Sequence, residues 1–205
     1  MRRPVLTVLL ILLAVLLPSL PSLPVADAAT RPWAIYLNLL YGSGWLSISL
    51  MSVATLLALR LPRLESWLGG LDLAYRAHRR LAEIGAGLGL LHYLLKLGSK
   101  EARRQGWLLK PNDFPSQALA WSEPYRDSAK SGAEWALYLV LALVAVALLR
   151  RVPYRWFAKL HRLLPAAFLV LVYHSLVFMP RAFWSSFAGS VGALLMLAGS
   201  VAALT

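Results

Sequence analysis

The stretch HRRLAEIGAGLGLLHY, residues 78–93, contains two of the four histidines in a chain of 205 residues. The other two histidines bound a second apolar run, HRLLPAAFLVLVYH, at residues 161–174. All four therefore lie in two hydrophobic segments, 14 residues apart in the first segment and 13 residues apart in the second. The expected fold and the expected chemistry both depend on this pairing.

The composition around these segments is that of a membrane protein. Hydrophobic residues make up 59% of the chain and charged residues 15%, whereas soluble domains are about half apolar and a quarter charged. A helix needs about 20 apolar residues to cross a hydrocarbon core about 30 Å thick. Because lipid satisfies no backbone hydrogen bonds, and because the apolar runs do not alternate like barrel strands, they should be helices. The sequence predicts an all-α membrane protein, a six-helix transmembrane bundle with spans near residues 5–24, 35–59, 81–98, 133–149, 157–178 and 183–204.

The first span has two interpretations. Residues 1–30 form either the first transmembrane helix or a segment like a signal peptide, with a basic start, an apolar middle and the triplet Ala-Asp-Ala at 26–28 as a cleavage site. Both interpretations place the residues near Arg31 outside the cytoplasm. Residues 31–205 then form the main membrane domain.

The placement of charge supports that orientation. Short connections on the inner side are densely basic, while the basic residues of the long outer loop are spread over more than 30 residues, as the positive-inside rule describes. We therefore expect a multi-pass protein of the cell (inner) membrane, with its N-terminus cytoplasmic unless residues 1–28 are cleaved. The net charge of +12 then reflects topology and the lipid bilayer. A nucleic-acid partner is not expected, because no basic soluble domain exists.

Several classes of site are excluded by residue type. The chain has no cysteine, which excludes iron–sulfur clusters, thiolate-bound zinc and covalently attached c-type haem. The motif GAGLG at 85–89 follows no strand, so it is not a dinucleotide-binding loop. No catalytic triad is recognisable. The histidines remain, and a histidine buried in a membrane usually faces the bundle interior and has a function.

The spacing of the histidines predicts two stacked pairs. Fourteen residues span about 21 Å of helix and end within about 40° of whole turns, so His78 and His92 point to one side. Thirteen residues span about 19.5 Å but leave His161 and His174 about 140° out of phase, and Pro165 between them should bend or rewind that helix. If both segments run outward, His78 lies level with His161 and His92 with His174. Two bis-histidine b-type haems require this arrangement.

Neighbouring residues suit a haem but have simpler explanations. Small residues midway along the first segment leave room for a macrocycle, or for close helix packing: Gly85, Gly87 and Gly89. Basic residues flank the inner pair and suit haem propionates, or ordinary anchoring at the membrane surface: Arg79, Arg80 and Arg162.

The segments YRAHRRLAEIGAGLGLLHYLLKL (75–97) and VPYRWFAKLHRLLPAAFLVLVYHSLVF (152–178) resemble the two haem-bearing helices of the ferric reductase and NADPH oxidase membrane-domain superfamily. That family carries its ligands on the third and fifth helices with the same two spacings, and SGAEW at 131–135 opens the fourth span. The resemblance implies an oxidoreductase with two b-type haems between helices 3 and 5. His78 and His161 would bind the inner haem, and His92 and His174 the outer one.

The resemblance also implies partners. Larger relatives continue into a flavin- and nicotinamide-binding module, whereas this chain stops at Thr205, so FAD or FMN would belong to a fused dehydrogenase domain or a separate cytoplasmic flavin reductase. Electrons would pass to an extracytoplasmic acceptor, such as a ferric chelate or dioxygen, selected by residues 110–127 and Arg181. One alternative is the haem subunit of a periplasmic methionine-sulfoxide reductase. Another is a histidine-lined carrier for a transition metal, with Glu83 as a co-ligand.

Overall fold

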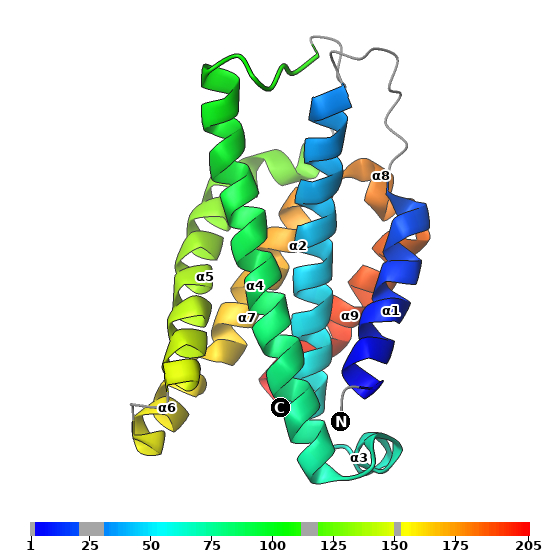
Figure 1. The fold of residues 1–205 in the computed structure, drawn as a ribbon, viewed down its shortest axis with the longest axis vertical. Helices are drawn as coiled ribbons and strands as arrows, with labels where there is room; N and C mark the ends of the chain where they lie inside the picture. Colours follow the sequence, from blue (N-terminus) through cyan, green and yellow to red (C-terminus); the bar gives the residue numbers. More distant parts are fainter. Residues whose placement is uncertain (1–2, 21–30, 112–118, 150–152) are drawn as a thin grey trace.

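A computed structural model describes residues 3–20, 31–111, 119–149 and 153–205. Within these ranges the regular structure is entirely helical (Figure 1). The α-helices are α1 (Arg3–Leu16), α2 (Arg31–Ala58), α3 (Pro62–Leu68), α4 (Leu71–Arg104), α5 (Arg126–Leu149), α6 (Tyr154–His161), α7 (Leu164–Phe178), α8 (Arg181–Trp184) and α9 (Phe187–Leu204). Two short 3₁₀ helices, η1 (Leu17–Ser19) and η2 (Ala120–Tyr125), complete the set.

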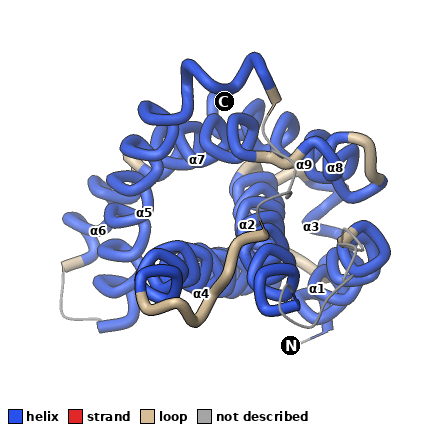
Figure 2. The backbone as a smooth tube through the Cα atoms, turned by 90° about the horizontal axis from the view of Figure 1, so that it is seen from above, coloured by secondary structure: helices blue, strands red, loops and turns tan. Residues whose placement is uncertain are grey.

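The longer helices run along one axis of the molecule and form a bundle (Figure 1). Seen along that axis, α2 lies between α1, α4, α7 and α9, and α5 lies beside α7 (Figure 2). Helices α3 and α6 lie at the end where α4 begins, and α8 lies at the opposite end (Figure 1). We call these the α3 end and the α8 end of the bundle.

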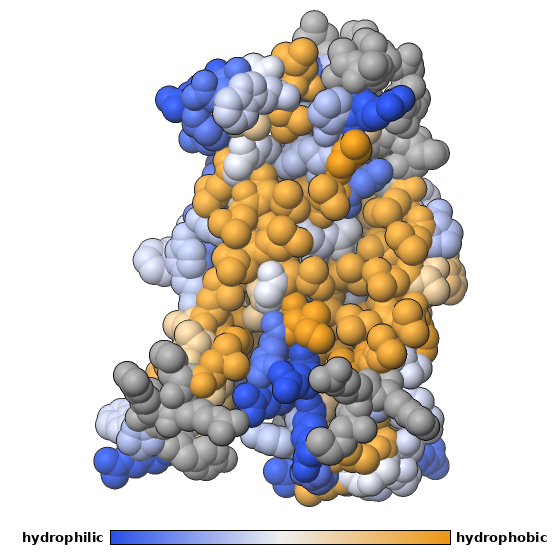
Figure 3. Space-filling model, viewed as in Figure 1, coloured by the Kyte–Doolittle hydropathy of each residue, from blue (hydrophilic) through white to orange (hydrophobic). Residues whose placement is uncertain are grey.

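Four of the described helical segments are long and apolar enough to cross a membrane: 31–58, 120–148, 155–178 and 187–204. The surface agrees, because hydrophobic residues cover most of the middle of the bundle and hydrophilic residues gather toward its ends (Figure 3). The prediction of a helical, multi-pass membrane protein is therefore confirmed. The apolar helix near the N-terminus is shorter, and in α4 the polar residues Glu83, His92 and Lys96 lower the hydropathy. Six spans thus stay a prediction.

Small residues let the central helix pack closely against its neighbours. The indole Nε1 of Trp45 on α2 donates a hydrogen bond of 2.9 Å to the carbonyl oxygen of Ala188 at the start of α9. One turn later, a Cβ on Gly192 would lie 2.5 Å from that same nitrogen. Farther along, a Cβ on Gly199 would lie 3.0 Å from the Cα of Ser52. Glycine thus allows α9 to pack against α2 along most of its length.

The predicted distortion near Pro165 is confirmed, and it is a break between two helices. Helix α6 ends at His161, and α7 begins at Leu164 with Pro165 in its first turn. The amide of Leu163 donates to the carbonyl oxygen of Leu160 at 3.0 Å, a tighter turn than the α-helix makes. Proline suits this position because amides of the first turn have no partner within the helix.

Two expectations concern residues outside the described ranges. The triplet at 26–28 lies within the segment 21–30, and residues 112–118 of the 110–127 loop also lie outside the described part. Cleavage of the N-terminal segment and the role of that loop therefore stay predictions.

Candidate functional site

The four histidines form two pairs in the bundle. The ring centres of His78 on α4 and His161 on α6 are 6.2 Å apart, with ring planes at 65°. The ring centres of His92 on α4 and His174 on α7 are 6.3 Å apart, with ring planes at 84°. The partners are those that the sequence spacing places level with one another. The first pair lies toward the α3 end, and the second lies about 21 Å along α4 toward the α8 end.

Three of the four rings are oriented by backbone carbonyl groups. The Nδ1 of His78 lies 2.7 Å from the carbonyl oxygen of Ala54, and the Nδ1 of His92 lies 2.9 Å from that of Leu40. The Nδ1 of His174 lies 3.1 Å from the carbonyl oxygen of Ala129 on α5. Because a carbonyl oxygen only accepts, each Nδ1 carries the proton and each Nε2 keeps a free lone pair. Histidines that bind metals are usually held in this way.

The two carbonyl groups on α2 match the two histidines on α4 because these antiparallel helices share a register. Midway between the two contacts, the hydroxyl of Ser47 donates to the carbonyl oxygen of Gly85 at 2.8 Å. Seven residues separate each contact from the next along both helices, which is close to two full turns. The same faces therefore meet at all three levels.

Two of the three glycines of α4 lie against neighbouring helices. A Cβ on Gly85 would lie 3.3 Å from the carbonyl oxygen of Ser47, so Gly85 permits close packing on α2. A Cβ on Gly89 would lie 3.1 Å from the hydroxyl of Ser47 and 3.3 Å from Leu137. Gly87 faces open space. Helix packing therefore accounts for Gly85 and Gly89, and room for a macrocycle stays a prediction.

A glycine of α2 lies directly against the outer pair. A Cβ on Gly44 would lie 2.9 Å from Nδ1 and 3.1 Å from Cε1 of His92. Real Cβ atoms do not approach this closely, so any side chain at position 44 would displace the ring. The sequence spacing gave no sign of this contact, because it links two helices far apart in the chain.

His161 is held differently from the other three. Its Nδ1 is buried and has no hydrogen-bond partner among the described residues. The break at Arg162 and Leu163 separates it from α7, which packs along α5 and places His174 beside Ala129. Phe157, one turn earlier on α6, is an aromatic neighbour, with ring centres 5.3 Å apart. Helix α6 thus contributes most to placing this ring.

The separation of each pair fits two ligands of one metal ion. A metal–imidazole bond is about 2.0–2.1 Å long. Two imidazoles that hold one ion between them then have ring centres roughly 6 Å apart. The observed 6.2 and 6.3 Å are close to this value. With two ligands in each pair, an iron that already has four equatorial ligands would be fully coordinated.

The arginines near the inner pair are engaged with a carboxylate. Arg79 Nε lies 2.8 Å from one oxygen of Glu83, and a terminal nitrogen of Arg80 lies 2.9 Å from the other. The spacing of these residues on α4 could have indicated the pairing, since residues three or four apart are neighbours on a helix. Propionate binding by Arg79 or Arg80 would have to compete with Glu83. Arg162 is exposed in the turn after α6.

A cation lies behind the outer pair. The guanidinium of Arg126 lies 4.4 Å from the ring centre of Phe178, whose ring centre is 4.7 Å from that of His174. This stack joins the start of α5 to the end of α7. From the sequence, Arg126 is expected only as part of the 110–127 loop and not beside a histidine.

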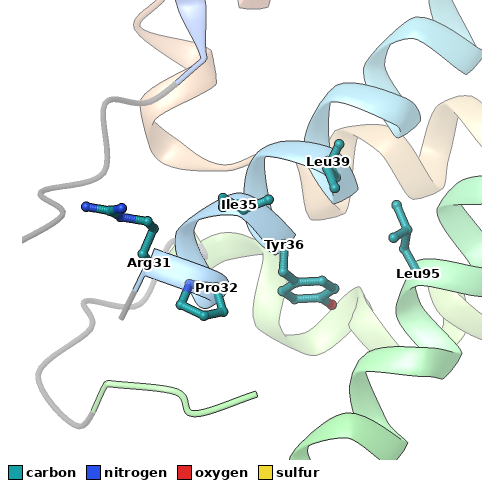
Figure 4. Close-up of a pocket in the computed structure, with 6 residues that line it drawn as sticks. All are labelled: Arg31, Pro32, Ile35, Tyr36, Leu39 and Leu95. Carbon is teal, nitrogen blue, oxygen red and sulfur yellow. The ribbon is translucent and has the colours of Figure 1, made fainter. Parts of the chain in front are cut away.

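Other features compete poorly for the functional role. No group of three or more histidine, cysteine or acidic residues that could hold a metal ion occurs in the described part of the chain. A pocket of about 410 Å³ opens where α2 begins, toward the α8 end (Figure 4). The pocket is lined by Arg31, Pro32, Ile35, Tyr36, Leu39 and Leu95. These residues are mostly apolar, and none of them is a histidine.

Comparison with known proteins agrees with this geometry. A family model described as ferric reductase like transmembrane component matches residues 43–172. The match begins within α2 and ends within α7, so it contains three of the four histidines, and His174 lies two residues beyond it. No curated protein matches the chain.

Proposed function

We propose that two b-type haems carry electrons through this chain, which belongs to the ferric reductase like transmembrane family and so serves transmembrane electron transfer. One haem would be held between His78 and His161, and the other between His92 and His174. The observation that carries the proposal is the separation of 6.2 and 6.3 Å between the paired rings. Bound haem supplies one-electron chemistry at its iron, which no side chain can supply. The protein supplies ligation, spacing and orientation.

Two relays are needed because the membrane is thick. A hydrocarbon core of about 30 Å is too wide for a single electron-transfer step between aqueous sites. The two histidine pairs divide this distance, since their levels on α4 are about 21 Å apart. The inner pair lies at the α3 end, and the distribution of basic residues favours this end as the cytoplasmic one. Electrons would therefore enter at His78 and His161 and leave at His92 and His174.

The orientation of the rings has a chemical consequence. Donation from Nδ1 to a backbone carbonyl group fixes the tautomer and makes the imidazole a more basic ligand. At the outer pair both rings are held in this way, by Leu40 and Ala129. At the inner pair only His78 is so held, by Ala54. If both histidines of a pair held one haem iron, no position on that iron would be left for an acceptor, which would then be reduced at the haem edge.

The proposed donor is a reduced flavin in a cytoplasmic flavin reductase or dehydrogenase domain, and the proposed acceptor is a ferric chelate or dioxygen outside. The test uses haem-loaded protein in liposomes, with a ferric chelate on the α8 side and reduced flavin plus a flavin reductase on the α3 side. We expect reduction of the chelate that is lost when any one of the four histidines is replaced. Full haem content without transfer from flavin would contradict the proposed donor, and absence of haem would contradict the site.

A further inference from the structure

Helix α6 and the turn after it carry three stripes of side chains, each with members three or four residues apart. Arg162 and Leu163 keep right-handed helical backbone angles, so the stripes continue through the turn. We call the exposed basic residues the cationic stripe, and they are Arg155, Lys159 and Arg162. We call the exposed hydrophobic residues the apolar stripe, and they are Trp156, Leu160 and Leu163, with exposed fractions of 52, 40 and 49%. Phe157 and His161 lie on the third, less exposed stripe.

Although the apolar segment 155–178 includes nearly all of α6, the break at Arg162 and Leu163 separates α6 from α7. The stripes of α6 fit a helix that lies on a membrane surface. Such a helix buries its apolar face at the boundary of headgroups and acyl chains and keeps lysine and arginine on its polar face. Helix α6 lies at the periphery of the α3 end, beside α5 (Figures 1 and 2). The Nζ of Lys159 is 5.0 Å from the ring centre of Trp156, so the two stripes meet at their border. Residues 153–165 contain no acidic residue, so the stripe complements an anionic surface.

His161 connects this surface to the inner pair. It is the last residue of α6, and it is the histidine whose Nδ1 has no hydrogen-bond partner among the described residues. The other inner histidine, His78, is fixed by the carbonyl group of Ala54. The position of His161 relative to His78 therefore depends on where α6 lies. Anything that holds α6 in place also holds this ring.

We infer that α6 is a membrane-surface helix whose cationic stripe binds anionic lipid headgroups, and that this binding holds His161 opposite His78. The inference rests on the proposed haem site but adds a partner and a form of control. Anionic lipid would strengthen retention of the inner haem and leave the outer haem unaffected. Each lysine or arginine near an anionic surface contributes about fivefold in affinity, so loss of the inner haem should slow by about fivefold or more.

The test compares haem-loaded protein in nanodiscs of phosphatidylcholine with protein in phosphatidylcholine mixed with phosphatidylglycerol. The measurement is the rate at which haem passes to apomyoglobin, and the inner phase is the one missing in His78→Ala. We expect only that phase to slow in the anionic discs. Because this comparison uses the unmodified chain, it does not depend on how a variant folds. Equal inner-haem rates in the two lipids would overturn the inference while leaving the proposed function intact.

A charge-removal variant then identifies the surface. The triple change Arg155→Gln, Lys159→Gln and Arg162→Gln should abolish the lipid dependence of the inner phase. The matched control removes the same charge at exposed positions toward the other end, Arg31→Gln, Lys100→Gln and Lys110→Gln, and should keep it. Equal behaviour of the two variants would overturn the inference. Absence of haem in every sample would instead refute the proposed function.

Discussion

Ser47 donates a hydrogen bond of 2.8 Å to the carbonyl oxygen of Gly85, at the midpoint between the two histidines of α4. This contact sets the register in which Leu40 meets His92 and Ala54 meets His78. Spacing of 14 residues along one helix is therefore matched by the same spacing of carbonyl groups along its neighbour. The orientation of both histidine rings on α4 thus depends on α2, which carries no histidine.

Gly44→Ala should displace the His92 ring, because the new Cβ would lie 2.9 Å from its Nδ1. We expect loss of most of the outer haem while the inner haem stays, measured by haem content and by the low-spin electron paramagnetic resonance signals. Gly87→Ala is the matched control, since a Cβ there meets nothing within 4 Å. In an ordinary helix either change would stabilise by about 0.5–1 kcal/mol. Equal haem content in the two variants would show that Gly44 does not position His92.

Gly85→Val should separate α2 from α4 at the shared midpoint and so affect both histidine pairs. The added methyl groups would extend beyond a Cβ that already lies 3.1 Å from Met51 and 3.3 Å from the Ser47 carbonyl oxygen. We expect a loss of about 1–3 kcal/mol of stability from overpacking, seen as a lower thermal midpoint, with both haems bound more weakly. Gly87→Val serves as the control. Selective loss of one haem would argue against a common register.

Single replacements of the histidines should fall into two groups. His78→Ala and His161→Ala should remove the inner haem, because their rings form one pair, and His92→Ala and His174→Ala should remove the outer one. Spectra and redox titration of the four variants measure this directly. If His92→Ala instead matched His161→Ala and differed from the other two, the pairing would be wrong.

Glu83→Gln should leave both haems in place, because this carboxylate is paired with Arg79 and Arg80. The ion pairs are partly exposed, so their removal should cost no more than about 1 kcal/mol. Haem content and the thermal midpoint are the measurements. A metal carrier that uses Glu83 as a ligand would instead lose affinity for zinc or copper in this variant while showing no haem at all.

Much of the fold follows from sequence periodicity and composition. Apolar runs predict the long helices, and Pro165 predicts the break that sets His161 apart from α7. The polar ends of α4 were missed: the predicted span covered 81–98, whereas the helix covers Leu71–Arg104. Those ends carry many charges, so a search for apolar runs does not find them. Charged side chains three or four residues apart still stabilise a helix there.

The support around the histidines could not be predicted from the sequence. Ala54, Leu40 and Ala129 act through carbonyl oxygens, and every residue type has one, so no residue pattern marks them. Gly44 and Gly85 become informative only when the register of α2 against α4 is known. The role of the four histidines as haem ligands stays a prediction, although the structure brings the two pairs together.

The most direct test of the central claim is the haem content of the purified chain, produced in cells supplied with haem and measured by extraction and reduced-minus-oxidised spectra. Two histidine pairs with ring centres 6.2 and 6.3 Å apart predict two non-covalent b-type haems per chain, both low-spin if each pair supplies two ligands to one iron. A protein that is folded in the membrane and contains no haem would contradict the account.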